Sequence, residues 1–252
     1  SRRQLLTMTL KVIDLFSGIG GFSLGLERTG GFQTSQFVEL DPKARQILKK
    51  HWPDVPQHDD IRTYKPTPRS ADVVCGGFPC QDISEAGHGA GIGGERSGLW
   101  KEMARVIRVV RPGWVIAENV STLRSRGLAV VLQDLNALGY DTEWHCIPAS
   151  AIGAPHRRDR IWILGYPNGK QKQPVQRRSG EEGGQTTATE RLLHLDDSNS
   201  DQDGNHFWVS EPPVGRVADG FPYRMDRVRL LGNSIVPQIA TLIGQQILLR
   251  RG

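Results

Sequence analysis

The stretch Ala71-Asp72-Val73-Val74-Cys75-Gly76-Gly77-Phe78-Pro79-Cys80-Gln81 carries the pattern around which the rest of the chain can be arranged. A short β-branched run, residues 71–74, precedes glycine, proline and cysteine, which predicts a buried strand that opens into a loop at Cys75. Pro79 fixes its own φ and lacks a backbone donor, so it stiffens the turn that presents Cys80. A thiolate is a strong nucleophile, which makes Cys80 a candidate for attack on carbon. The alternative is a small buried cysteine that only packs.

Length, charge and cysteine content limit the class of protein. The 252 residues suffice for one large α/β domain, or for a large domain with a small appendage. No apolar run approaches the roughly 18 residues of a membrane span, and Ser1-Arg2-Arg3-Gln4 lacks the apolar part of a secretion signal, so we expect no membrane association. Three cysteines without Cys-x-x-Cys spacing predict neither a disulfide framework nor a metal site. The formal net charge of +5 suits a polyanionic partner.

The first sixty residues predict a nucleoside-binding unit. A strand at residues 10–16 leads through a glycine turn at residues 17–21 into a helix at about residues 22–28, and bare backbone at such a turn lets a ligand approach closely. A second strand, residues 35–39, ends in Glu39, where a carboxylate could hold a ribose diol. Asp60, after a short extended piece, could accept a hydrogen bond from an adenine amino group. Taken singly, each acid is more often a capping or surface residue.

The glycine turn favours a ligand without phosphates. It does not continue as Gly-x-Gly-x-x-Gly, and no Lys-Ser/Thr follows it, so the turn is poorly suited to bind either a pyrophosphate or a nucleoside triphosphate. S-adenosylmethionine is the obvious candidate cofactor, because it presents an adenine, a ribose diol and a zwitterionic amino acid.

Beyond Cys80, strands and helices alternate. Residues 84–98 are rich in glycine and predict a lid over bound substrate, with a slack surface loop as the alternative. A buried strand is predicted at residues 114–117, and Glu118 follows at its carboxyl end, where ligands bind in open α/β sheets. Further helices are predicted at residues 42–51, 99–110 and 128–138, and further strands at residues 141–147 and 161–164, the latter preceded by basic residues. This alternation predicts a doubly wound sheet.

The composition changes near Asn168. From there to about residue 206 the chain is polar and predicts a loop-rich insertion. Arg216, Arg224 and Arg227 then lie near aromatic residues, a mixture that suits a nucleic-acid face. The segment Gly232-Asn233-Ser234 is expected to open a final amphipathic helix that packs back on the sheet.

Five motifs, in their order along the chain, resemble those of the DNA cytosine-5 methyltransferase family. They are Asp14-Leu15-Phe16-Ser17-Gly18-Ile19-Gly20-Gly21, Gly77-Phe78-Pro79-Cys80-Gln81, Glu118-Asn119-Val120, Arg157-Arg158-Asp159-Arg160 and Gly232-Asn233-Ser234-Ile235-Val236-Pro237. The resemblance covers residues 11–166 and about 214–249, and the last segment is similar to that of phage and prophage members with a short target recognition region.

The resemblance implies a fold, a division of the chain and an activity. The fold is α/β, a doubly wound and mostly parallel Rossmann-like sheet with a small irregular recognition region. Residues 8–166 would form the catalytic and cofactor-binding domain, residues 167–231 the target recognition region, and residues 232–250 a helix returning to the catalytic domain. The implied reaction is methyl transfer from S-adenosylmethionine to C5 of cytosine in double-stranded DNA, on a base flipped out of the helix.

The residue types agree with this chemistry. Addition of the Cys80 thiolate to C6 builds electron density at C5, and Glu118 would offset the charge by protonating or hydrogen-bonding N3, for which it needs a raised pKa. The resemblance assigns Arg158 and Arg160 to the O2 edge of cytosine and to nearby phosphates. It implies a cofactor pocket formed by Phe16, Ser17, Gly18, Gly20, Gly21, Glu39, Leu40, Asp60, Ile61, Pro79, Asn233 and Ser234. It places DNA contacts at Gln81, Ser84, Arg96, Arg216, Arg224 and Arg227.

Other functions remain open at this point. An RNA cytosine-5 methyltransferase would use the same Cys80 and Glu118. A methylase of free nucleotides is disfavoured by the basic segments, and a catalytically weak DNA-binding relative is disfavoured by the full set of candidate catalytic residues. We expect a monomer in the cytoplasm of a bacterial or phage-infected cell, with a restriction endonuclease encoded nearby as a candidate partner.

Overall fold

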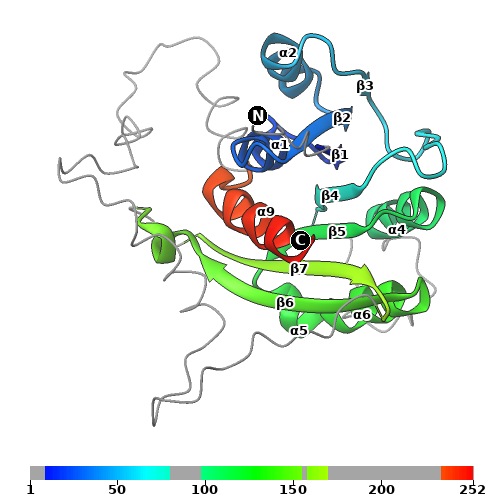
Figure 1. Ribbon diagram of the computed structural model, residues 1–252, viewed down its shortest axis with the longest axis vertical. Coiled ribbons are helices and arrows are strands. Elements are labelled where there is room, and N and C mark those ends of the chain that lie inside the picture. Colours follow the sequence, from blue (N-terminus) through cyan, green and yellow to red (C-terminus); the bar gives the residue numbers. More distant parts are fainter. Residues whose placement is uncertain (1–8, 80–97, 155–157, 170–233, 252) are drawn as a thin grey trace, which may run out of the picture.

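The computed structural model describes residues 9–79, 98–154, 158–169 and 234–251. In this part of the chain a seven-stranded sheet carries helices on both faces (Figure 1). The elements, in chain order, are β1 (Leu10–Leu15), α1 (Gly21–Glu27), β2 (Phe32–Val38), α2 (Pro42–His51), β3 (Gln57–His58), β4 (Val73–Gly77), α4 (Gly98–Val110), β5 (Trp114–Val120), α5 (Leu123–Arg126), α6 (Leu128–Ala137), β6 (Tyr140–Pro148), the short helix η3 (Ala149–Ile152), β7 (Asp159–Pro167) and α9 (Pro237–Arg251).

The sheet has the order β3-β2-β1-β4-β5-β7-β6. All pairings from β3 to β5 are parallel, whereas β7 runs antiparallel to both of its neighbours, β5 and β6. The predicted doubly wound, mostly parallel sheet is therefore confirmed. Because the chain moves outward in opposite directions from β1 and β4, a crevice is expected at the carboxyl ends of these two strands.

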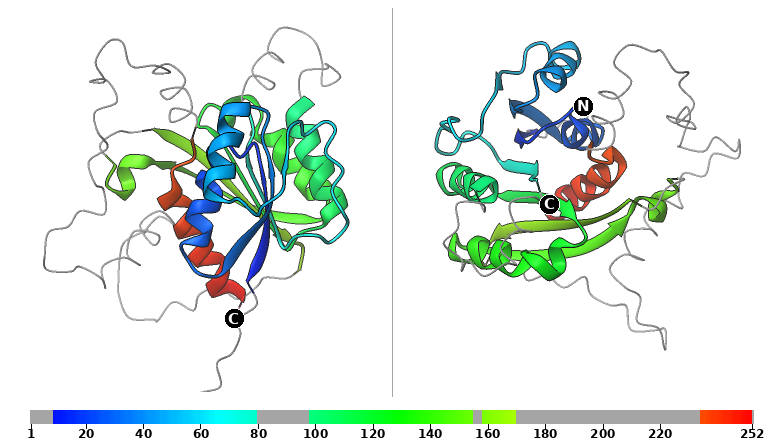
Figure 2. Two further views of the ribbon diagram at one scale, coloured as in Figure 1. Left: turned by 90° about the horizontal axis from the view of Figure 1, so that it is seen from above. Right: turned by 180° about the vertical axis from the view of Figure 1, so that it is seen from behind.

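Successive residues of the strands point to opposite faces of the sheet and contribute to two separate hydrophobic cores. Val12 faces the core that α1 and α9 cover, and its neighbour Ile13 faces the core that α4, α5 and α6 cover. The edge-on view in Figure 2 shows α1 and α9 on one side of the sheet and α4 on the other.

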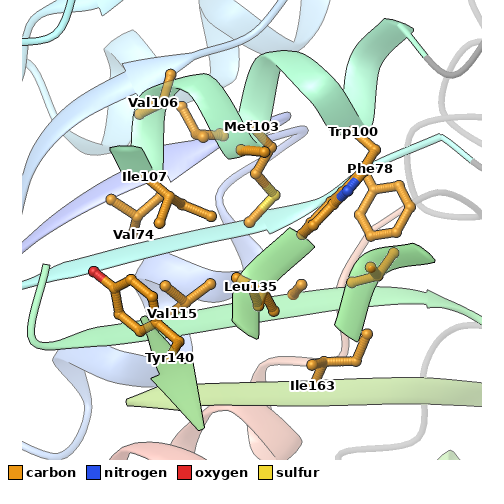
Figure 3. Packing of buried hydrophobic residues seen from close by; sticks show 14 of the residues in the cluster. Val74, Phe78, Trp100, Met103, Val106, Ile107, Val115, Leu135, Tyr140 and Ile163 are labelled. Atoms are coloured by element: carbon orange, nitrogen blue, oxygen red, sulfur yellow. The ribbon is translucent and has the colours of Figure 1, made fainter. Parts of the chain in front are cut away.

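The α4 core shows how the helix periodicity is used. Trp100, Met103 and Ile107 recur on one face of α4, and Figure 3 shows them directed toward Val74 and Val115 of the sheet. The Trp100 ring also packs against Phe78, just after β4, so α4 contacts the carboxyl end of that strand as well. None of the helices in the described part of the chain has the length and apolar character needed to cross a lipid bilayer.

Several predicted strands, β5 and β7 among them, have different bounds in the structure, and two of the differences have a clear physical cause. The first is in β2, which begins at Phe32 rather than at residue 35. In its pairing with β1, Thr34 lies opposite Val12 and Gln36 opposite Ile13, so Ser35 is an extra, unpaired residue. Such a bulge breaks the alternation on which the prediction relied. The second differs because β4 continues through Gly77, although the glycines predicted a loop from Cys75 onward.

The glycines of β4 serve packing rather than a turn. A Cβ at Gly76 would lie 2.9 Å from the carbonyl oxygen of Leu15, so β1 and β4 can pair closely only because this position lacks a side chain. Tertiary contact therefore overrides the local preference of glycine for loops.

The last helix also begins later than expected. It starts at Pro237, where proline suits the first turn, and not at Gly232-Asn233-Ser234. It packs on α1 so closely that a Cβ at Gly25 would lie 2.1 Å from the Pro237 carbonyl oxygen. Thr241 Oγ1 donates a hydrogen bond to the carbonyl oxygen of Gly25 at 2.8 Å, which ties the two helices together.

Candidate active site

A cleft of about 1160 Å³ lies at the carboxyl edge of the sheet, next to β1 and β4. Its residues come from the ends of β1, β2, β4 and β5, from α2 and α4, and from the start of β7. They are Phe16, Gly18, Val38, Glu39, Leu40, Asp41, Pro42, Lys43, Ala44, Asp59, Asp60, Ile61, Arg62, Gly77, Phe78, Pro79, Gly98, Leu99, Glu102, Glu118, Asn119, Val120, Arg158 and Arg160. The topology thus brings together acids that lie up to about eighty residues apart in the chain.

The glycine turn after β1 forms one wall. Phe16 has a φ of 53°, a left-handed conformation that is strained for a bulky residue and turns the chain sharply out of the strand. Gly18 also has a positive φ, 55°, and a Cβ there would meet no atom within 4 Å, so its backbone faces open space in the cleft. A ligand can therefore approach the backbone of Gly18 directly.

Four residues of the predicted cofactor set do not line the cleft. The Ser17 hydroxyl points inward and donates to the Asp14 carbonyl oxygen at 2.6 Å. A Cβ at Gly20 would lie 2.6 Å from the Trp52 ring, and a Cβ at Gly21 would lie 2.6 Å from the Ile235 carbonyl oxygen. These glycines thus allow close packing around the turn. The fourth residue, Ser234, precedes α9 and does not line the cleft either.

Glu39 connects β2 to the glycine turn. Its Oε2 accepts a hydrogen bond from the Gly18 backbone N–H at 2.7 Å, and its Oε1 accepts one from the Asp41 N–H at 2.8 Å. A carboxylate offers about four acceptor positions, so two remain for a ligand diol. The next residue, Leu40, lines the cleft and is 64% exposed, which places an apolar surface beside the carboxylate.

Asp60 is engaged by a residue that the sequence did not single out. Arg62 donates to both carboxylate oxygens of Asp60, at 3.0 Å from Nε and 2.7 Å from the nearer terminal nitrogen, and its backbone N–H adds a bond at 2.9 Å. These hydrogen bonds hold the pKa of Asp60 below its ordinary value. An adenine amino group would have to share this carboxylate with the Arg62 guanidinium, while Ile61 lines the cleft beside it.

Glu118 is the buried acid at the other end of the cleft. Its Oε1 lies 3.0 Å from Arg160 Nε, and its Oε2 lies 2.9 Å from the position that a Cβ on Gly77 would take. Burial raises the pKa of Glu118 to about 7, and the charges of Arg160 and Arg158 oppose that rise. At neutral pH the carboxyl group can therefore both give and accept a proton.

Arg158 and Arg160 enter the cleft from the start of β7. Arg158 has a φ of 33° and donates to the Ser234 carbonyl oxygen at 2.6 Å, so the segment before α9 helps to orient it. Arg160 pairs with Val120 across the antiparallel β5–β7 ladder, which sets its side chain beside Glu118. Glu118, Arg158 and Arg160 thus line the same cleft, and the charges of both arginines act on the Glu118 carboxyl group.

Asn119 is a further residue of the site that received no role from the sequence. It is buried, and its Nδ2 donates to the Phe78 carbonyl oxygen at 2.9 Å, just before Pro79. It therefore fixes the exit of β4 against β5. Its position in the motif Glu118-Asn119-Val120 was the sequence feature that could have identified it as a residue of the site.

Asp14 is a second group without an assigned role, and it lies beneath the glycine turn. Its side chain is fully buried, Oδ2 accepts a hydrogen bond from Ser23 Oγ at 2.7 Å, and Oδ1 has no partner among the described residues. Burial raises its pKa to about 7. A lone acid inside the apolar run of residues 10–16 was the signal that could have identified it.

Several predicted site residues lie outside the described part of the chain. They are Cys80, Gln81, Ser84, Arg96, Arg216, Arg224, Arg227 and Asn233. Pro79, which directly precedes Cys80, does line the cleft.

Comparison with known proteins shows which family the chain belongs to. Residues 10–211 match the model of the family described as C-5 cytosine-specific DNA methylase. The chain is 40% identical over 163 residues to the type II methyltransferase M2.BsuMI of Bacillus subtilis, and 32% identical over 163 residues to the type II methyltransferase M.HhaI of Haemophilus parahaemolyticus. These matches cover 62% and 63% of this chain. They span 41% of the Bacillus protein and 50% of the Haemophilus protein.

Two solved structures share the fold. A DNA modification methyltransferase encoded within a prophage of E. coli superposes with a TM-score of 0.52 at 27% identity, over 63% of this chain and 47% of that one. The Dnmt2 methyltransferase of S. pombe superposes with a TM-score of 0.55 at 22% identity, over 66% of this chain and 53% of that one.

Proposed function

Because the chain belongs to the C-5 cytosine-specific DNA methylase family, we propose that it transfers a methyl group from S-adenosylmethionine to C5 of cytosine in double-stranded DNA. One observation carries the proposal: a buried carboxyl group with a pKa of about 7, paired with arginine, shares a cleft with the open glycine turn after β1. Residues 167–231 would form the target recognition region, and residues 8–166 with the last helix would form the catalytic domain.

The residues at the β1–β2 end of the cleft fit S-adenosylmethionine. Glu39 has free acceptor positions for the ribose diol, Leu40 and Phe16 offer apolar surface to the adenine, and Gly18 leaves its backbone open. Acidic side chains outnumber basic ones in the cleft lining away from Glu118, where Glu39, Asp41, Asp59, Asp60 and Glu102 accompany Lys43 and Arg62, which suits a sulfonium cation. When bound, S-adenosylmethionine would supply an electrophilic methyl group to the activated cytosine.

Glu118 would act at N3 of the target base. In its protonated form the carboxyl group donates to N3 and offsets the negative charge that grows on the ring during nucleophilic addition. The Arg160 guanidinium keeps the carboxyl group oriented at 3.0 Å, while Arg158 and Arg160 offer donors to the O2 edge. Gly77 leaves room for Oε2 to point into the cleft.

The thiolate of Cys80 would be the nucleophile that adds to C6 of cytosine. Addition breaks the C5–C6 π bond and places an electron pair on C5, and C5 uses this pair to form its bond to the transferred methyl group. Loss of the C5 proton with release of the thiolate then restores the double bond. The target atoms lie inside the duplex, so the base must first be flipped into the cleft at a cost of a few kcal/mol. A cleft of about 1160 Å³ exceeds an ordinary small-ligand pocket and can hold a nucleoside and a base together.

Trapping on 5-fluorocytosine tests the proposal. Fluorine cannot leave as a cation, so a duplex in which 5-fluorocytosine replaces every cytosine should stall the enzyme as a covalent complex in the presence of S-adenosylmethionine. A long duplex of mixed sequence offers many short recognition sites at once, which removes the need to know the target. We expect an adduct that resists denaturation and maps to Cys80.

Three controls give the outcome its meaning. Omission of S-adenosylmethionine and the variant Cys80→Ala should each abolish the stable adduct. An RNA of the same sequence is tested in parallel, and an adduct on RNA alone would replace DNA by RNA as the substrate. If neither nucleic acid traps the protein, the proposed activity is wrong.

A further inference from the structure

Two arginines, on opposite sides of the cleft, bind the backbone of the loops that carry the nucleoside-binding residues. Neither side chain lines the cleft itself. We propose that Arg45 and Arg105 are positioning residues that hold these two loops in the geometry that binds the adenosyl group. The inference rests on the proposed function and adds two residues to which neither the sequence motifs nor the site geometry gave a role.

Arg45 holds the loop between β2 and α2. It lies in the first turn of α2, and one terminal guanidinium nitrogen donates to the carbonyl oxygens of Glu39 and Leu40, both at 3.0 Å. Two consecutive peptide planes are thereby fixed. The same two residues present the carboxylate and the apolar surface to the cleft, so Arg45 determines where both point.

Arg105 holds the loop after β3 from the other side. It lies on α4, its Nε donates to Glu102 Oε2 at 2.6 Å, and a terminal nitrogen donates to the Ile61 carbonyl oxygen at 2.7 Å. The ion pair with Glu102 fixes the guanidinium, and the guanidinium in turn fixes the backbone at Ile61 beside Asp60. The loop therefore follows the position of α4.

The chemistry of arginine suits this task. A guanidinium presents several donors in one rigid plane, so a single side chain can bind two acceptors and lose little further freedom when it does. Without these bonds the carbonyl groups would turn to water, and the loops would have to be ordered when the ligand binds. Binding would then carry an additional entropic cost.

The test measures binding of S-adenosylmethionine and S-adenosylhomocysteine by isothermal titration calorimetry. Arg45→Met and Arg105→Met keep the aliphatic part of the side chain and remove the donors. We expect the dissociation constant for both ligands to rise about tenfold, with a less favourable binding entropy. Arg45→Lys keeps a donor near both carbonyl groups and should stay within about threefold of wild type.

Matched controls separate positioning from general stability. Lys50 on α2 and Arg108 on α4 are exposed and make no hydrogen bond or ion pair within the described residues, so Lys50→Met and Arg108→Met should leave both dissociation constants unchanged. Urea denaturation without ligand checks that each variant remains folded. If Arg105→Met does not fold, Arg105→Lys is measured in its place, and we expect it to bind more weakly than wild type because one ammonium group cannot serve both Glu102 and Ile61.

The possible failures are distinguishable. Wild-type protein that binds neither ligand would show that the proposed cofactor is wrong, and the inference would fall with it. Wild-type protein that binds, together with arginine variants that bind within about twofold of it, would overturn the positioning role and leave the proposed function intact.

Discussion

Replacement of Asp14 by asparagine should change how the stability of this protein depends on pH. Asp14 is fully buried, its Oδ2 accepts a hydrogen bond from the Ser23 hydroxyl group, and its Oδ1 has no hydrogen-bond partner in the described residues. Burial raises its pKa from the ordinary value of 3.8 to about 7. Asparagine keeps the shape and the acceptor for Ser23 but cannot ionise.

The sign of the effect follows from proton binding. Between about pH 4 and about pH 7 the folded protein keeps the Asp14 proton while the unfolded chain has lost it. The free energy of unfolding therefore falls as the pH rises through this window, by about 1.4 kcal/mol per unit, and levels off above it. From about pH 5 to about pH 8 the contribution of Asp14 amounts to about 2 to 3 kcal/mol.

Urea denaturation followed by tryptophan fluorescence measures this contribution. The free energy of unfolding is determined for wild type and Asp14→Asn at about pH 5 and about pH 8. Other buried acids, such as Glu118, titrate in both proteins and cancel in the difference. Asp14→Asn should gain about 2 to 3 kcal/mol relative to wild type at the higher pH.

A constant difference between the two proteins at both pH values would refute the reasoning. Ser23→Ala provides an independent check, because the Ser23 hydrogen bond lowers the pKa of Asp14. Its removal should move the upper end of the pH window to higher pH, while the lower end, set by the unfolded chain, stays in place. An unmoved window would show that the hydroxyl group does not stabilise the ionised carboxylate.

Three further substitutions address the catalytic end of the cleft. Glu118→Gln keeps the shape of the side chain but removes its acidic proton. The single-turnover rate should therefore fall by about 10²-fold to 10⁴-fold, with little change in the dissociation constant of S-adenosylmethionine. An unchanged rate would exclude the proposed role of Glu118 at N3. Gly77→Ala would place a Cβ 2.9 Å from Glu118 Oε2, so we expect at least about a tenfold lower single-turnover rate in a folded protein, and wild-type turnover would contradict the steric argument. Asn119→Ala removes the side-chain donor to the Phe78 carbonyl oxygen and should lower the free energy of unfolding, measured by urea denaturation, by about 1 to 3 kcal/mol. A change below about 0.5 kcal/mol would show that this hydrogen bond contributes little to stability.

The elements that the sequence predicted well are those in which local signals and tertiary packing agree. The helix α2 begins at Pro42 behind the cap of Asp41, and α4 ends just before Pro112-Gly113, as the local pattern indicates. The strand β4 was too short in the prediction because Gly76 and Gly77 read locally as a loop, whereas the close approach of neighbouring strands selects them.

The candidate site was predictable to the extent that topology alone determines it. Carboxyl ends of parallel strands share one edge, so Glu39 and Glu118 had to lie at the same edge of the sheet once the sheet was recognised. The engagement of Asp60 by Arg62 and the backbone bonds of Arg45 depend on side-chain conformation and on distances within loops. No periodicity or spacing in the sequence encodes these contacts.

The joint between α1 and α9 has a consequence for how the protein is made. Thr241 bonds to the backbone at Gly25, 216 residues earlier, and the apolar side of α1, with Phe22 and Leu26, is buried only when α9 is in place. The ribosome synthesises α9 long after α1, so the nascent chain carries an uncovered apolar surface until α9 has been made. Closure of so long a loop is also slow. Chains that stop before Pro237 should therefore be degraded or held by chaperones, so that only chains that include α9 accumulate in the cell.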